Sequence, residues 1–249
     1  MTYINDYSWK CLLGKQSKNI EIKDSIYFWD VNKNHHFCTS KNLIESDLDG
    51  LENKGFHYMT PENLSLLKTK YKVNKSNLIS VCIDLDKFKI SGKSNSGIRH
   101  SINSAKKHNL TIKESFNDIN DVKKMLNEWS EVLAEKYFRD FSGKNHYFYQ
   151  NNFHKDCVNL FLYDKDDLVA FASASPEKDN CSYIIGKALC NRIHGLSEYA
   201  DYLLYNKLIE SGVSVINLGQ AKGGLYKYKR KFSGSFDIVH HDGFVEGIK

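Results

Sequence analysis

The sequence predicts a mixed α/β (α+β) fold in which a mostly antiparallel sheet is flanked by helices. Short apolar segments bounded by turn residues recur along the chain, and such segments are typical of strands. Two longer segments place their apolar residues at helical spacing. In the last third, three strand-like segments precede a helix and a further strand, so this last strand can return parallel to an earlier one through a right-handed crossover.

Strands and one short helix are expected in the first part of the chain. Residues 25–31 and 36–40 are rich in aromatic and β-branched side chains and predict a hairpin. Residues 61–70 begin with a proline, which suits the first turn of a helix. The apolar run at residues 78–85 predicts a buried strand.

A polar loop and two helices follow. Residues 91–97 contain only glycine, serine, lysine and asparagine and predict a flexible loop. Residues 98–109 then form a basic amphipathic helix, and residues 110–114 a short strand. The apolar positions of residues 119–137 recur with a period close to 3.6, which predicts a long amphipathic helix.

The last third is expected to contain a three-stranded meander and a crossover. Residues 158–163 and 168–175 predict a hairpin, and residues 181–189 its third strand. Residues 199–211 predict a helix that ends at a glycine. Residues 213–218 are the strand that returns beside the meander.

Composition and charge predict a globular protein with one basic patch. The 249 residues are 41% hydrophobic and 26% charged and include two prolines, which excludes a disordered or collagen-like chain. The net charge is only +5, but residues 222–231 contain five lysines or arginines and no acid. A local basic patch of this kind favours a phosphate-bearing partner.

Cysteine, histidine and hydropathy patterns indicate a cytoplasmic protein without a metal site. No two of the six cysteines form a CxxC pair, so reduced thiols are expected. His35, His36 and Cys38, and likewise the stretch 240–242, are of metal-ligating types but lack paired spacing. No segment approaches the roughly 20 apolar residues that a membrane span needs, so any membrane contact would be peripheral.

Three segments, taken in order, resemble a known family. Residues 98–107 are similar to an "R-x-x-I-x-x-A-x-K" helix, residues 199–219 to a helix followed by "N-x-G", and residues 225–232 to an "L-Y-x-F-K-x-x-F" closing segment. These motifs resemble the GNAT-fold acyltransferases, and within them the Fem-type aminoacyltransferases and the C-terminal domain of phosphatidylglycerol lysyltransferases. The resemblance implies a GNAT-like acyltransferase domain at residues 91–249, with residues 1–90 as an N-terminal GNAT-like half or lid.

The resemblance also implies a reaction. An aminoacyl group would pass from aminoacyl-tRNA to an amine or hydroxyl acceptor, without acetyl-CoA and without a metal. The acceptor stays open among a lipid headgroup, a cell-wall precursor, a peptide and a small metabolite, because the sequence shows no long second domain or membrane portion such as relatives carry.

Two residues are candidates for catalysis. Attack on an acyl ester develops an oxyanion, which a fixed cation stabilises, and Lys229 matches the lysine of the closing motif. Asp201 matches an acidic position of the lysyltransferases and would orient or deprotonate the acceptor. The alternatives are a surface lysine in a basic loop and a solvated helix aspartate.

Five further residues are candidates for substrate binding. Arg99 and Lys106 would hold phosphates of the tRNA acceptor stem, or would line a solvated helix face. Tyr226 and Tyr228 would stack on the terminal adenine, or would pack on the sheet. Gly219 permits a tight turn or a close approach of a ligand.

Two other functions compete with this interpretation. An acetyl-CoA-dependent N-acetyltransferase of the same fold would bind pyrophosphate at the loop 191–197. This loop contains Arg192 but only one glycine, Gly195, so the usual "Q/R-x-x-G-x-G/A" pattern is incomplete. The second alternative is a non-catalytic GNAT-like module that binds RNA or protein through its basic end.

Overall fold

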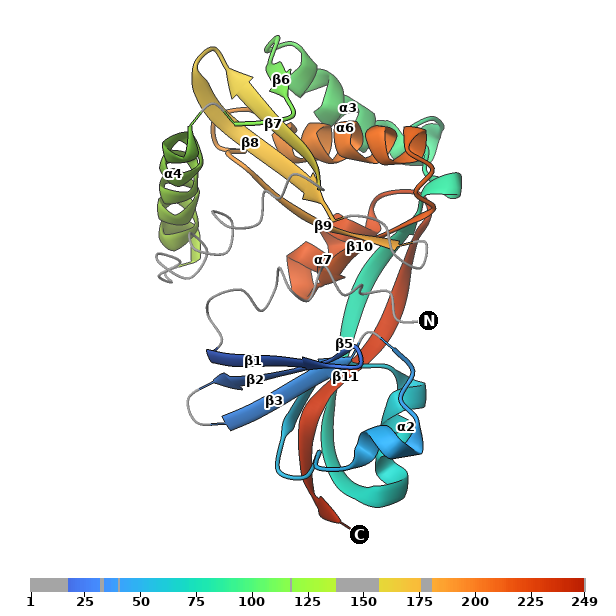
Figure 1. The fold of residues 1–249 in the computed structure, drawn as a ribbon. Helices are drawn as coiled ribbons and strands as arrows, with labels where there is room; N and C mark the ends of the chain where they lie inside the picture. The colour runs from blue at the N-terminus through green and yellow to red at the C-terminus, as the bar shows by residue number, and fades with distance from the viewer. Residues whose placement is uncertain are drawn as a thin grey trace.

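The computed structural model describes residues 18–31, 34–39, 41–116, 118–137, 157–175 and 181–248 (Figure 1). Within these residues the strands form one 11-stranded sheet in the order β1-β2-β3-β4-β11-β5-β10-β9-β8-β7-β6. The strands are β1 (Lys18–Lys23), β2 (Ile26–Val31), β3 (Asn34–Thr39), β4 (Gly55–Met59), β5 (Tyr71–Asp84), β6 (Thr111–Lys113), β7 (Val158–Asp164), β8 (Asp167–Ala174), β9 (Cys181–Ala188), β10 (Val215–Gln220) and β11 (Ser235–Ile248). The α-helices are α2 (Pro61–Lys70), α3 (Ser96–Lys106), α4 (Ile119–Tyr137), α6 (Leu196–Glu210) and α7 (Gly223–Arg230). Three short 3-10 helices are η2 (Glu45–Leu48), η3 (Leu85–Lys87) and η4 (Lys93–Asn95).

The predicted fold class is confirmed: the sheet is mixed, mostly antiparallel and flanked by helices. The expected hairpin near the beginning of the chain is β2 and β3, which pair antiparallel. The expected crossover is also present, because Val215, Ile216 and Asn217 of β10 pair in parallel with residues 181–183 of β9.

Two long strands join the two ends of the sheet. β5 and β11 are each 14 residues long, pair antiparallel and extend through both halves of the molecule (Figure 1). β5 begins at Tyr71, seven residues before the strand predicted at residues 78–85. The prediction was too short because residues 74–77 are all polar and exposed, so hydropathy alone shows no strand there.

Helices cover both faces of the upper sheet. Leu160 and Leu162 of β7 face the core formed with α3 and α6, whereas Phe161 and Tyr163 face the core formed with α4. Consecutive residues of a strand point to opposite faces, so α4 lies across the sheet from α3 and α6, as Figure 1 shows. A separate core lies under α2 in the lower half.

Most of the closing segment, residues 225–232, is helical and not a loop. Residues 223–230 form α7, which begins at Gly223 with a φ of 56°. Its glycines and interleaved basic residues do not predict a helix. Contacts with α6 and the sheet stabilise the helical conformation.

Cys38, Cys82, Cys157 and Cys190 form no disulfide bond in the part of the chain that the structure describes, and Cys11 lies outside it. None of the described helices is long and apolar enough to cross a membrane.

Candidate active site

One face of α6 presents two carboxyl groups and a tyrosine. Glu198, Asp201 and Tyr205 are three and four residues apart, a spacing that aligns side chains on a helix. Tyr205 is buried and its ring packs edge-on against Phe232 at a centroid distance of 5.5 Å. Tyr205 and Phe232 thus form a buried aromatic contact below the half-buried Glu198 and Asp201.

α7 supplies the partner of Asp201. The Tyr228 hydroxyl donates to Asp201 Oδ2 over 2.7 Å. Removal from water raises the pKa of Asp201 to about 6, although the Tyr228 hydrogen bond and the charges of Lys231 and Lys229 act in the opposite direction. Burial, together with the Asp201 charge, raises the pKa of Tyr228 well above its usual range. At neutral pH the pair therefore holds one proton on Tyr228 and little on Asp201.

Lys231 connects the second carboxyl group to the same cluster. Its ammonium forms an ion pair with Glu198 and lies 3.9 Å from the centre of the Tyr228 ring. The ring of Tyr228 thus contacts both this cation and the ring of Phe232, to which it is nearly perpendicular.

Lys229 is fixed at the end of β10. Its Nζ donates to the carbonyl oxygens of Leu218, Gly219 and Gln220, the latter two over 3.2 Å and 2.9 Å. These carbonyls converge because the chain bulges: the register with β5 shifts between Asn217 and Gln220, and Gly219 has a φ of 74°.

The "N-x-G" motif explains this bulge. Asn217 is fully buried, and its Oδ1 accepts a hydrogen bond of 2.7 Å from the Gly219 backbone N–H. Gly219 adopts the left-handed conformation that glycine accepts without a steric cost. Asn217 and Gly219 therefore shape the carbonyl cradle that holds Lys229.

The bulge also marks the place where two parallel strands separate. Pairing between β10 and β9 ends at Asn217 and Tyr183. Beyond it, residues 184–188 of β9 pair with β8. The end of β10 that carries the cradle therefore runs without β9 beside it.

Four of the predicted site residues come together here, and three do not. Lys229, Asp201, Tyr228 and Gly219 form one cluster between α6, α7 and β10. Tyr226 points elsewhere, because its hydroxyl donates to Asp237 Oδ2 of β11 over 2.7 Å. The other two residues, Arg99 and Lys106, lie on α3.

Arg99 bonds to the loop before α3, and Lys106 lies beside two tyrosine rings of α6. Arg99 Nη1 donates to the carbonyl oxygens of Ile90 and Gly92, over 2.6 Å and 2.5 Å, and so fixes the loop before α3. Lys106 Nζ lies 5.1 Å from the ring centre of Tyr202 and 6.0 Å from that of Tyr199. Lys106 is exposed, whereas Arg99 is half-buried.

The sequence motifs did not single out Glu198, Tyr205 or Lys231. Helical spacing would have found the first two, because they lie three and four residues from Asp201. Lys231 lies three residues after Tyr228, but it follows the last residue of α7, so its direction depends on where that helix ends.

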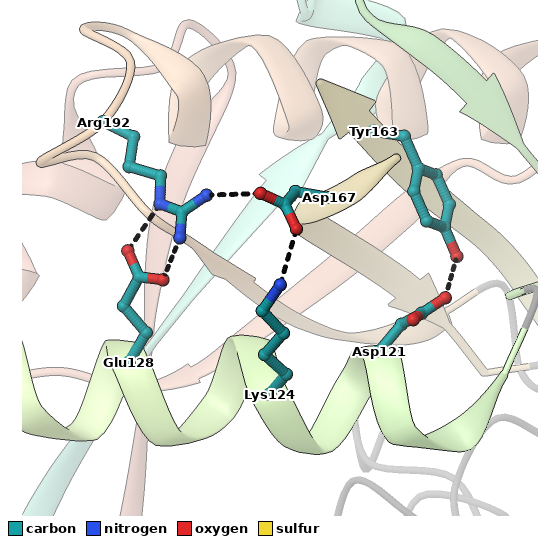
Figure 2. Close-up of polar contacts among 6 residues, drawn as sticks. All are labelled: Asp121, Lys124, Glu128, Tyr163, Asp167 and Arg192. Carbon is teal, nitrogen blue, oxygen red and sulfur yellow. Dashed lines mark hydrogen bonds and ion pairs between the residues drawn. The ribbon is translucent and has the colours of Figure 1, made fainter. Parts of the chain in front are cut away.

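In the loop that was considered for pyrophosphate binding, the arginine side chain is bonded to carboxylate groups. Arg192 Nε donates to Glu128 Oε1 over 2.6 Å, and Nη1 to Asp167 Oδ2 over 3.3 Å (Figure 2). Asp167 also pairs with Lys124, at 2.7 Å. This network joins α4, β8 and the loop before α6.

No group of three or more histidine, cysteine, aspartate or glutamate side chains in the described residues could hold a metal ion. The side chains of this site that can take part in acid–base or electrostatic chemistry are Lys229, Asp201 and Tyr228.

The fold and the family match define an acyltransferase. The sequence model of the family described as "Phosphatidylglycerol lysyltransferase, C-terminal" matches residues 55–236. This match spans more than half of the chain, so the protein belongs to that family, and the resemblance inferred from the three motifs is confirmed. A search of curated proteins finds no match.

Solved structures share the fold. L-PGS from Bacillus licheniformis is 18% identical, with a TM-score of 0.70 over 93% of this chain and 84% of that chain. The C-terminal domain of a putative lysylphosphatidylglycerol synthetase from Agrobacterium fabrum is 13% identical, with a TM-score of 0.72 over 99% and 88%. FemX is 12% identical, with a TM-score of 0.59 over 95% and 89%.

Proposed function

We propose that this protein transfers an aminoacyl group from aminoacyl-tRNA to an amine or hydroxyl acceptor. The observation that carries the proposal is that a fixed cation, Lys229, lies in the same cluster as a carboxyl group whose pKa is about 6, Asp201. Such a carboxyl group accepts and returns a proton near neutral pH, which general base catalysis requires. Family membership supports acyl transfer as the reaction class.

The acceptor attacks the ester carbonyl carbon while Tyr228 and Asp201 take its proton. The Tyr228 hydroxyl accepts this proton as it passes its own to Asp201 Oδ2, to which it already donates. A new bond from the acceptor nitrogen or oxygen to the carbonyl carbon forms, and the carbonyl oxygen becomes an oxyanion. The C–O bond to the tRNA ribose then breaks, and Asp201 returns the proton to the departing ribose oxygen.

Lys229 stabilises the oxyanion. An ammonium group has three N–H donors, and three carbonyl oxygens accept from Lys229. The contact with Gly219 O is the longest, at 3.2 Å, so the oxyanion would replace this acceptor. A charge-assisted bond to an oxyanion is roughly twice as strong as one to a neutral carbonyl, which favours the exchange as the negative charge develops.

The basic residues of α3 and α7 would bind the tRNA. Lys106, Lys222 and Lys227 are exposed and can reach phosphates without losing a buried contact. Arg99 would bind through the guanidinium nitrogens that do not hold the loop before α3. Tyr226 and Tyr228 are half-buried, so part of each ring is accessible. The terminal adenine would stack on this accessible part.

The family name points to the first donor and acceptor to test. It describes a phosphatidylglycerol lysyltransferase, so lysyl-tRNA and vesicles of phosphatidylglycerol come first. The arginine of the loop that would bind the pyrophosphate of acetyl-CoA, Arg192, is already paired with two carboxylates, which makes acetyl-CoA the less favoured donor.

Hydroxylamine trapping tests the reaction without knowledge of the acceptor. The protein is incubated with a mixture of aminoacyl-tRNAs and hydroxylamine, a small nucleophile that converts aminoacyl esters into hydroxamates. Hydroxamate formation above the uncatalysed rate, with no turnover of acetyl-CoA, is the expected result. Turnover of acetyl-CoA alone would overturn the proposal.

A further inference from the structure

A row of polar side chains crosses the sheet on the face opposite α7. Asn217 of β10 pairs with Cys82 of β5, and Ser80, two residues earlier, shares the face of Cys82. His240 of β11 pairs with Leu78, which also lies on this face of β5. We call Asn217, Ser80, His240, Asp242 and His57 the polar row.

The register shows that this face is not the one under α7. Tyr226 of α7 bonds to Asp237 of β11, at an odd-numbered position. His240 and Asp242 occupy even-numbered positions of the same strand, and β11 pairs with β5 without interruption from Ser235 to Val245. Alternate residues of a strand point to opposite faces, so the polar row and α7 lie on different sides.

Two members of the row each contain a buried polar atom that has no hydrogen-bond partner among the described residues. The exposed fractions of Ser80 and His240 are 0% and 2%, and within the described residues Ser80 Oγ and His240 Nε2 make no hydrogen bond. A buried polar atom without a partner destabilises the fold, so its presence requires an explanation.

The tautomer of His240 is fixed. Its Nδ1 lies 3.2 Å from the carbonyl oxygen of Tyr58, which can only accept, so Nδ1 carries the hydrogen and Nε2 presents a lone pair. Burial lowers the pKa of His240, which keeps the ring neutral. The group left open is therefore a hydrogen-bond acceptor.

The other end of the row reaches solvent. Asp242 Oδ2 lies 3.1 Å from His57 Nδ1, and these side chains are 26% and 33% exposed. Asp242 Oδ1 accepts from the backbone N–H of Tyr58 over 2.9 Å. Tyr58 has a φ of 53°, a strained conformation for an aromatic residue, and such strain is frequent at functional sites.

We propose that the polar row binds the acceptor substrate through hydroxyl or ammonium groups that donate to His240 Nε2 and contact Ser80 Oγ. This inference rests on the proposed function. Ser80 pairs with Gln220, whose carbonyl oxygen accepts from Lys229, so this part of β10 lies between the buried end of the row on one face and the proposed catalytic lysine on the other. Pairing of β10 with β9 ends at Asn217, and the acceptor would reach Lys229 past this point. Asp242 and His57 form its accessible end.

Imidazole NMR tests the inference without turnover. Protein labelled with ¹⁵N at histidine is titrated with glycerol, which carries hydroxyl donors, and with ethanolamine, which adds an ammonium group. A saturable shift of the His240 Nε2 resonance is expected with one or both probes, and the stronger response identifies the donor chemistry. If neither probe shifts this resonance, the inference is overturned. A site that holds only a buried water would give this result.

Two substitutions at position 240 separate the ring nitrogens. His240→Asn keeps a donor near Nδ1 and removes the acceptor at Nε2, whereas His240→Gln keeps an amide oxygen near Nε2. In aminoacyl transfer to the better probe, we expect His240→Asn to raise KM about tenfold and His240→Gln to recover part of this loss. The control is His241→Asn, on the other face, which should leave KM unchanged.

The two proposals fail differently. Hydroxylamine trapping needs no acceptor site, so it should proceed at the wild-type rate in folded His240→Asn protein. Normal trapping with unchanged KM in this variant would refute the acceptor site alone. Absence of trapping in the wild type, with the NMR shift present, would refute the aminoacyl transfer and leave the binding site in place.

Discussion

Tyr228 and Asp201 are 27 positions apart in the sequence, yet the hydroxyl of one donates to the carboxylate of the other over 2.7 Å. α6 brings Asp201 to this contact and α7 brings Tyr228. Desolvation raises the pKa of both groups, and the Tyr228 hydrogen bond limits the rise for Asp201. The contact thus sets the pH range in which Asp201 can act as a base.

Replacing Asp201 with asparagine should stabilise the fold at neutral pH while it removes activity. The folded pKa of about 6 lies above the usual aspartate value of 3.8. Between these values the folded state binds more protons than the unfolded state, so the wild type loses stability as pH rises from about 4 to 6. The difference corresponds to about 3 kcal/mol at most. Urea unfolding at pH 4 and pH 8 measures it.

In Asp201→Asn protein this pH-dependent loss should disappear, because asparagine does not titrate. Its oxygen still accepts from Tyr228, so the contact itself is kept. The measured quantity is the difference in free energy of unfolding between the wild type and the variant. If this difference were the same at pH 4 and pH 8, Asp201 would not be desolvated in the folded state.

The Tyr228→Phe variant should shift the pH dependence of the reaction upward. The Tyr228 hydroxyl stabilises the charged form of Asp201, so its loss raises the pKa of the carboxyl group above about 6. A hydrogen bond to a charged group contributes about 1.5 to 3 kcal/mol, which is roughly one to two pH units. Hydroxylamine trapping from pH 5 to 9 gives the midpoint. A lower rate with an unchanged midpoint would mean that Tyr228 does not interact with the base.

Lys229→Met should lower both activity and stability. Lys227→Met is its matched control at saturating aminoacyl-tRNA, where a loss of tRNA binding by Lys227 does not limit the rate. Both lysines are on α7, but Lys227 is exposed, whereas Lys229 holds three carbonyl oxygens. Loss of a group that stabilises an oxyanion lowers the rate by about 10²- to 10³-fold. Unsatisfied carbonyl oxygens add a stability loss of about 1 to 3 kcal/mol. Single-turnover rates and urea unfolding separate the two effects. Unchanged kcat in a folded Lys229→Met protein would exclude catalysis by this lysine.

Much of this cluster could be inferred from sequence because its residues lie in motifs. The "N-x-G" unit and the closing segment both lead to the cradle and Lys229, and helix periodicity placed α6 to within three residues of its observed start. A strand that returns parallel through a crossover is a topological consequence of element order, and it was found as predicted.

The parts that were missed depend on contacts between distant segments. β4 and β11 alternate polar and apolar residues irregularly, and their pairing becomes evident only when β11 lies beside β5. The direction of Tyr226 toward Asp237, away from Tyr228, follows from the helical conformation of α7, which its glycines and basic residues do not predict.

Gly195 should be irreplaceable, and Gly212 provides the control. Their φ values are 80° and 82°, so alanine strains the backbone equally at both positions. At Gly195 a Cβ atom would lie 2.0 Å from the carbonyl oxygen of Ser101 on α3, whereas at Gly212 no atom lies within 4 Å. We expect Gly212→Ala to cost about 1 to 2 kcal/mol and Gly195→Ala clearly more, because α3 and α6 must move apart. Equal losses in urea unfolding would show that these helices separate freely.

Arg192 should contribute to stability and not to the reaction. Its ion pairs with Glu128 and Asp167 are partly exposed, and each such pair contributes about 0.2 to 1 kcal/mol. Arg192→Met and Glu128→Gln should therefore each lower stability by about 1 kcal/mol. The double variant should lose less than the sum, because both substitutions break the same contact.

The rate of hydroxylamine trapping should change by less than about twofold in Arg192→Met protein, because its guanidinium faces α4 and β8 (Figure 2). The same variant tests the acetyl-CoA alternative. In an acetyltransferase that holds pyrophosphate at this loop, Arg192 would have to leave two carboxylates to meet the anion, and its removal would weaken acetyl-CoA binding. Saturable acetyl-CoA binding to the wild type that is lost in Arg192→Met protein would therefore contradict aminoacyl transfer and favour the acetyltransferase.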